Sequence, residues 1–275
     1  NAEGRLVLHG SADAKDAATG LTFKGLLEAP EGSTVVTPLT TLINKLVDGG
    51  FGLDAAAAEL KVKAALGITS DVDLTSFDPV VAALSDIPAD VAAGIEVARH
   101  GVVVQNLITQ AAAVVRAADP SNTTPYGGWG TSTSDVYKSM ASHIDGLAAN
   151  TEIMPDGNTD AENIAVLKDL VEGAAQVAGL TGADLTEVQT VSDEVAAVMY
   201  AGVTQLQSAV DNNSGSVDAL TSMAEAAAVA QGSSATSITA AVDAIEADLA
   251  DTALLSTLVT SYSGANLTTA LDAVM

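Results

Sequence analysis

The side chains that most often carry acid–base or nucleophilic chemistry are scarce in this chain. It contains three histidines, His9, His100 and His143, and no cysteine. None of the histidines belongs to an HExxH motif or an i, i+4 pair, the spacing with which one helix presents two ligands to a metal ion. The sequence also lacks a G-x-S-x-G motif, a Walker-type loop and a G-x-G-x-x-G run after a strand. We therefore predict that the chain is not an enzyme and assign no catalytic or cofactor-binding residue.

Two oxygen-rich loops are candidate calcium sites. Their ligands would be Asp71, Asp73 and Asp78 in the first loop, and Asp156, Asn158 and Asp160 in the second. The second loop places oxygen atoms at alternating positions, as calcium loops do, without the complete layout of an EF-hand. Asp and Asn also suit turns and helix caps, and Glu162 forms a capping box with Thr159. Calcium is the one candidate cofactor, and we expect it to stabilise the fold modestly through charge relief.

The glycine-rich segment Tyr126-Gly-Gly-Trp129-Gly130 contains the only tryptophan. It has no nearby lysine and no preceding strand, so it does not match a phosphate-binding loop. We expect residues 121–130 to form a loop in which Trp129 fills a gap between helices. An exposed Trp129, together with Tyr126, would instead form a contact or carbohydrate-stacking site.

The charge distribution restricts the partners of this chain. The formal net charge is -25, and fourteen acidic residues but no lysine or arginine follow Lys168. Such a surface repels phosphate groups, which argues against nucleic acid and anionic lipid as partners. No apolar run approaches the roughly 18 residues of a membrane-spanning helix, so we expect no membrane insertion.

Cysteine usage and the first residues indicate an environment. Large exported bacterial proteins commonly lack cysteine, whereas eukaryotic secreted domains of this size usually contain disulfides. We therefore predict an extracellular or bacterial cell-surface location. The chain begins at Asn1 without an initiator methionine or a signal peptide, which leads us to expect a mature or excised fragment.

The elements that would position these residues differ between the two ends of the chain. Residues 1–36 contain two short runs rich in branched and aromatic side chains, Arg5–His9 and Leu21–Leu27, which predict strands. From Thr37-Pro38 onward, capped apolar stripes of helical period predict roughly eight to ten helices. The segment Gly232-Ser-Ser is expected to break one of these helices.

These elements define the predicted fold class as mainly α, an Ala-rich multi-helix bundle with a short N-terminal β-hairpin or partial β-sheet. We divide the chain into an N-terminal strand segment (1–36), a first helical part (37–120) and a second helical part (131–275). One continuous bundle is favoured over two because no long polar linker separates the helical parts.

Three stretches carry a resemblance to a known class of module. They are residues 16–42, which include Thr19-Gly-Leu-Thr-Phe23 and Thr34-Val-Val-Thr-Pro-Leu-Thr-Thr-Leu42, then Ala64-Ala-Leu-Gly67 and Asp73-Leu-Thr-Ser-Phe-Asp-Pro79. Over about residues 10–115 the chain resembles a helical module of large secreted bacterial surface proteins, including repeat-in-toxin-type adhesins and calcium-binding exoproteins. In those proteins the module commonly follows an immunoglobulin-like or carboxypeptidase-regulatory-like β-domain. The resemblance implies that residues 1–36 are the last strands of such a β-domain, and it supplies no catalytic residues.

We therefore predict an extracellular structural or adhesive domain of a bacterial surface or secreted protein, acting as a spacer, an assembly unit or a matrix contact. Its expected partners are a neighbouring β-domain or copies of itself, which would bind through the N-terminal strands. An incomplete sheet has unpaired backbone N–H and C=O groups at its edge that can pair with another strand. Extracellular matrix and polysaccharide are further candidates. The alternatives are a ligand-binding module that holds a small molecule or metal ion between its helices, and an enzyme that uses paired carboxylates.

Overall fold

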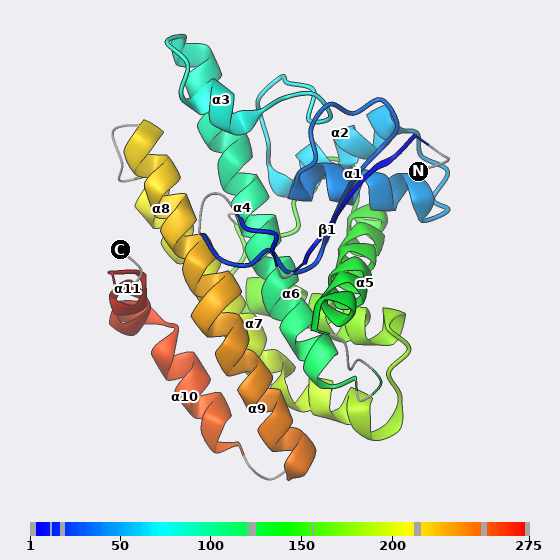
Figure 1. Ribbon diagram of the computed structural model, residues 1–275, viewed down its shortest axis with the longest axis vertical. Coiled ribbons are helices and arrows are strands. Elements are labelled where there is room, and N and C mark those ends of the chain that lie inside the picture. Colours follow the sequence, from blue (N-terminus) through cyan, green and yellow to red (C-terminus); the bar gives the residue numbers. More distant parts are fainter. Residues whose placement is uncertain are drawn as a thin grey trace.

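Helices make up most of this protein. The computed structural model describes residues 4–11, 13–16, 20–119, 121, 125–155, 157–211, 216–248 and 252–272. In this part of the chain the only sheet has two strands, which confirms the predicted mainly α class with a short N-terminal hairpin. Helix α4 (Pro88–Ala117) runs through the middle of the molecule, and helices from both ends of the chain pack around it (Figure 1).

Local signals start and stop the first helices as expected. The elements are α1 (Pro38–Asp48), α2 (Ala55–Leu66) and α3 (Pro79–Ala83). The Thr37 hydroxyl accepts from the backbone N–H of Thr40, and the Thr40 hydroxyl accepts from the N–H of Thr37, which completes a capping box at the start of α1. Gly67 ends α2 in the left-handed conformation, with φ of 69°, where glycine is favoured.

The second half of the chain adds longer helices and one irregular segment. The elements are α5 (Pro125–Gly146), α6 (Asp160–Val177), α7 (Gly182–Asp211), α8 (Ser216–Ala228), the π-helical segment η1 (Val229–Ser234), α9 (Ala235–Ala247), α10 (Ala253–Ser261) and α11 (Gly264–Asp272). The break expected at Gly232 is wrong, because the helix continues from α8 through η1 into α9. A π-helical turn accommodates the extra residue, and the Gln110 amide donates to the Ser234 hydroxyl at 2.8 Å, which ties η1 to α4.

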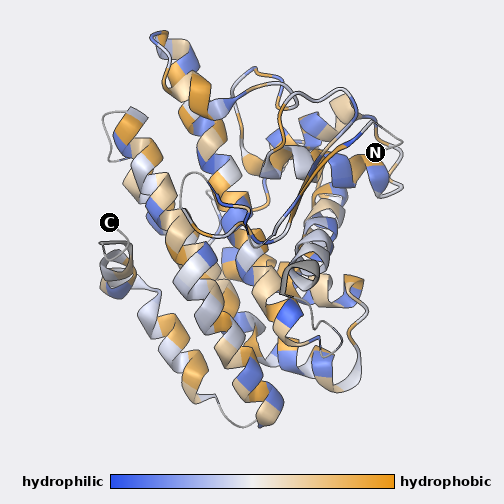
Figure 2. Ribbon diagram, viewed as in Figure 1, coloured by the Kyte–Doolittle hydropathy of each residue, from blue (hydrophilic) through white to orange (hydrophobic). Residues whose placement is uncertain are grey.

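The hydrophobic core has one main part and one small satellite. Residues from both helical parts, such as Leu42, Ile108 and Val242, belong to the main cluster. A separate small cluster lies between α8, α4 and the end of α7 and includes Met223 and Leu206. Apolar residues also occur along α3 and at the start of α8 (Figure 2). The side chains of Val81 and Val217 in these helices are exposed. Among the described helices, none combines the length and apolarity that crossing a membrane requires.

The N-terminal hairpin lies across this helical body (Figure 1). Strand β1 (Leu6–His9) pairs antiparallel with β2 (Leu26–Ala29), so that Leu6 faces Ala29 and His9 faces Leu26. Both strands are shorter than, or displaced from, the runs predicted from the sequence. The apolar run at Leu21–Leu27 forms only an isolated bridge at Thr22 before β2 begins.

Candidate functional site

Buried threonine hydroxyls attach β2 to the helices. The Thr41 hydroxyl accepts from the Glu28 N–H at 2.9 Å, and the Thr40 hydroxyl donates to the Glu28 carbonyl at 2.9 Å. Further along the strand, the Leu26 N–H donates to the Thr133 hydroxyl at 3.2 Å. These side chains take the place of a neighbouring strand, because they satisfy the backbone groups on the outer edge of β2.

A nearly buried ion pair strengthens the same attachment. Lys45 Nζ lies 2.5 Å from Glu28 Oε2, and the Asn44 amide donates to the same oxygen at 2.9 Å. Tyr137 is fully buried close by, and burial raises the pKa of its phenol far above the usual value, so it remains a neutral hydroxyl. The Thr-Pro-Leu-Thr-Thr motif at 37–41 is therefore a docking element for the hairpin, which the sequence did not indicate.

The outer edge of β1 is open, in contrast to that of β2. The Gly10 N–H donates to the Gly25 carbonyl at 2.7 Å, which marks this position as a hydrogen-bonded pair in the antiparallel ladder. The alternation of such a ladder then directs the N–H and C=O of Val7 and His9 away from β2. Within the part of the chain that the structure describes, no group bonds to these outward atoms.

The side chains of β1 are exposed as well. Leu6, Val7 and Leu8 are 40%, 39% and 45% accessible, respectively. Neighbouring side chains on a strand point to opposite faces, so both faces of β1 carry accessible apolar surface. An open edge with exposed apolar side chains is the geometry that pairs with another strand.

A wide apolar groove of about 950 Å³ lies beside the hairpin. The hairpin, α3, α4 and α8 supply most of its walls, through side chains such as Leu8, Phe23, Val97 and Leu220. Its rim includes Leu84 and Val217, which are 56% and 63% accessible although both are large and apolar. We call this cavity the apolar groove.

Most hydrogen-bonding groups in the apolar groove are engaged with the protein itself. The Lys15 ammonium donates to the Thr22 hydroxyl at 2.9 Å. The Gln105 amide donates to the Thr109 hydroxyl at 3.0 Å. Among the described residues that line the groove, Lys15 and Asp16 are the only lysine, arginine or carboxylate residues, and their formal charges cancel. The groove is thus an uncharged apolar surface on a strongly acidic protein.

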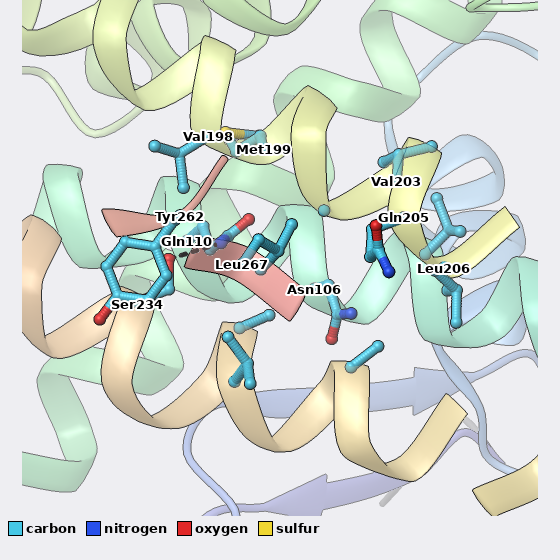
Figure 3. Close-up of a pocket in the computed structure, with 15 residues that line it drawn as sticks. Asn106, Gln110, Val198, Met199, Val203, Gln205, Leu206, Ser234, Tyr262 and Leu267 are labelled. Carbon is cyan, nitrogen blue, oxygen red and sulfur yellow. Dashed lines mark hydrogen bonds between the residues drawn. The ribbon is translucent and has the colours of Figure 1, made fainter. Parts of the chain in front are cut away.

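A second, much smaller cavity lies on the other side of the contact between α4 and α8. It is bounded by α4, α7, η1 and the end of the chain, and its volume is about 20 Å³ (Figure 3). Asn106 and Gln110 project toward it, and the Gln110 amide is bonded to Ser234. The buried Asn106 Oδ1 has no hydrogen-bond partner among the described residues. This volume suits a single water molecule rather than an organic ligand, so the apolar groove is the candidate site for a larger molecule.

The loop that contains the first calcium candidates is fixed by protein groups. Glu96 of α4 accepts hydrogen bonds from the backbone N–H and hydroxyl groups of both Thr69 and Ser70. Burial would raise the pKa of Glu96, but these hydrogen bonds outweigh burial and lower it to about 2. Glu96 is therefore an anionic anchor for this loop at neutral pH.

The predicted calcium ligands of the first loop serve turns and caps. Asp73 accepts from the N–H and hydroxyl of Thr75, and hydrogen bonding to Thr75 lowers the pKa of Asp73. Asp78 accepts from the N–H groups of Val80 and Val81 and caps α3. Asp71 is exposed in the same loop.

The second loop lies only partly within the described residues. Asp156 falls outside them, whereas the Asn158 amide donates to Asn163 and Asp160 accepts from the Tyr200 hydroxyl at 2.9 Å. Across the described ranges, no three histidine or carboxylate side chains gather as they would around a metal ion. The calcium assignment in both loops stays a prediction.

Trp129 lies in a helix, so the predicted loop over residues 121–130 is wrong from Pro125 onward. Proline suits the first turn of a helix, and α5 begins at Pro125. Trp129 is buried, with Lys24 Nζ at 5.1 Å and Arg116 Cζ at 5.4 Å from its ring centroid. Burial and the charge of Arg116 lower the pKa of Lys24. The side chain of Tyr126 falls outside the described residues.

The three histidines lie apart in the fold and form no acid–base pair among the described residues. His9 lines the apolar groove, and His143 lies in α5. Burial and the neighbouring Arg99 lower the pKa of His100 to about 4, although Glu96 acts in the opposite direction. His100 is therefore neutral at pH 7, as expected for a packed side chain.

Comparisons with known proteins identify no relative of this chain: no family model, no curated protein and no solved structure matches it. The two features that stand out are the open edge of β1 and the apolar groove. The strand-like run at Arg5–His9 indicates the edge of β1 from the sequence. The apolar groove has no local signal in the sequence, because its walls come from distant segments.

Proposed function

We propose that this chain is a structural or adhesive module of a bacterial surface or secreted protein that pairs with a second copy of itself through β1. The observation that carries the proposal is the difference between the two edges of the hairpin. Threonine hydroxyls occupy the outer edge of β2, whereas the outward backbone groups of Val7 and His9 on β1 are available to another strand.

The exterior location rests on composition and on the resemblance to secreted surface modules. A cysteine-free chain with a net charge of -25 suits an oxidising, salt-containing environment, where ions screen the repulsion between acidic surfaces. The proposal assigns no catalytic activity to the chain. It makes the module an assembly unit, whose contact is formed by backbone hydrogen bonds rather than by a specific pocket.

The geometry favours a second copy because β1 is complementary to itself. Two antiparallel β1 strands related by a twofold axis would exchange hydrogen bonds through Val7 and His9. In the register that pairs Val7 with His9, the exposed side chain of Leu8 would lie beside Leu8 of the other copy. The strand has only four residues, so we expect a weak, concentration-dependent dimer. Because both copies are strongly acidic, added salt should strengthen it.

Sedimentation equilibrium over a range of protein concentrations and salt concentrations tests this proposal. We expect the wild type to form dimers as concentration rises, and Val7→Pro to stay monomeric because proline removes the outward N–H of an edge strand. Leu60→Lys is the control, since Leu60 is an exposed apolar residue on α2 and belongs to neither strand.

Two outcomes would overturn pairing between copies. One is a wild type that remains monomeric at every concentration and salt condition. The other is equal dimerisation of the wild type, Val7→Pro and Leu60→Lys. In the first case, a strand peptide from a neighbouring β-domain is the next occupant to test against β1.

A further inference from the structure

Gly101 has an unexplained position in the wall of the apolar groove. It lies in the interior of α4, where glycine lowers helix stability by about 1 kcal/mol relative to alanine. A Cβ atom added at Gly101 would meet nothing within 4 Å. By contrast, a Cβ at Gly94 in the same helix would lie 2.2 Å from the backbone nitrogen of Ala83. Packing therefore requires Gly94 but not Gly101, which leaves the groove wall without a side chain at this position.

The size of the apolar groove matches a small molecule. Its volume of about 950 Å³ lies within the range of about 300–1,000 Å³ that small-molecule sites occupy. The groove extends from the exposed apolar residues of α3 and the start of α8 toward the hairpin, where η1 also approaches. Gly232 of η1 marks this approach, since a Cβ there would lie 3.3 Å from the Leu21 side chain. An elongated molecule would follow this course between α4 and α8.

The chemistry of the walls identifies the kind of molecule. The described lining is mostly aliphatic, its phenyl side chains are those of Phe23 and Phe77, and its two formal charges cancel. The net charge of -25 disfavours anions throughout the molecule. The imidazole of His9 and the amide of Gln231 also line the groove and suit a hydroxyl group. We propose that the apolar groove binds a long aliphatic chain with an uncharged, hydroxyl-bearing head, such as a monoacylglycerol.

This inference goes beyond the assembly through β1 and does not depend on it. It is tested with N-phenyl-1-naphthylamine, an uncharged probe whose fluorescence rises in apolar surroundings. We expect the wild-type protein to bind the probe saturably. Monolauroylglycerol should displace it, and laurate, which has the same chain but a charged head, should compete about tenfold less well.

Two wall variants and one control locate the binding. Gly101→Phe places a ring in the apolar groove from α4, and Ala224→Leu narrows it from α8. Each should weaken probe binding, and Gly101→Phe by about tenfold or more. Gly130→Phe is the matched control, because Gly130 lies inside α5, an added Cβ meets nothing within 4 Å, and the residue does not line the groove. Circular dichroism and thermal melts confirm that each variant is folded.

Three results would overturn the inference. The first is the absence of saturable probe binding by the wild type. The second is unchanged binding in whichever of the Gly101 and Ala224 variants folds. The third is displacement of the probe by laurate as effective as displacement by monolauroylglycerol, which would overturn the preference for an uncharged head group. Binding is read by fluorescence and competition, whereas the pairing through β1 is read by sedimentation equilibrium, so failure of one proposal is distinguishable from failure of the other.

Discussion

Replacing Thr41 by valine should detach β2 from the helices at one defined hydrogen bond. Valine keeps the shape of the fully buried threonine but removes the hydroxyl that accepts from the Glu28 N–H at 2.9 Å. The Glu28 carbonyl retains its hydrogen bond from Thr40, so one buried donor loses its partner. An unsatisfied buried N–H lowers stability by about 1–3 kcal/mol, and we expect a loss near the middle of this range.

Urea denaturation gives the change in the free energy of unfolding, and hydrogen exchange at the Glu28 amide gives its location. We expect this amide to exchange much faster in Thr41→Val than in the wild type. Thr204→Val is the control, because Thr204 is an exposed helical threonine whose hydroxyl bonds only to carbonyls of its own helix. An equal loss of stability in both variants, or unchanged exchange at Glu28, would refute the docking of β2 by threonine.

Two further predictions concern α4. Hydrogen bonds from Ser70 and Thr69 outweigh burial and lower the pKa of Glu96 from 4.5 to about 2. This shift corresponds to a contribution of about 3 kcal/mol to the free energy of unfolding without solvent screening. Screening of this partly exposed group reduces the contribution to about 1–2 kcal/mol. Glu96→Gln should lose this stabilisation above pH 4.5. The difference in free energy of unfolding between the variant and the wild type should shrink as the pH falls toward 2. A difference, measured by urea denaturation, that is constant with pH would contradict this. Thermal melts should show that Gly101→Ala is more stable than the wild type by about 1 kcal/mol. Gly94→Ala should be less stable by about 1–3 kcal/mol, because a Cβ at Gly94 would meet backbone atoms of α3. A Gly94→Ala variant more stable than Gly101→Ala would be inconsistent with this packing.

The parts of the fold that could be predicted depend on residues close together in the sequence. The N-cap at Thr37, the capping box at Thr159 and the glycine at Gly67 that ends α2 are all present as expected. Each is a contact within a few residues, so its pattern can be recognised without knowledge of the tertiary structure. The helical period of the apolar residues is local in the same sense, and it led to the correct fold class.

The failures arose where tertiary contacts overrode local tendency. The glycines around Trp129 favoured a loop, but the segment is helical and its tryptophan ring is buried near Lys24 and Arg116. Gly232 favoured a break, but contacts of η1 with α4 support a π-helical turn instead. The apolar groove could not be predicted from the sequence, because Gly101 becomes part of its wall only when α3, α8 and the hairpin pack nearby.

The threonine hydroxyls that occupy the edge of β2 also limit the size of any strand-paired assembly. A hairpin with two open edges could add copies on both sides and extend without end, as fibrils do. Among the described strands, a copy that paired through β1 would have no second open edge to offer, because the backbone groups of Glu28 are already bonded to Thr40 and Thr41. Each molecule would then pair with one other through these strands, and growth by this route would stop at two copies.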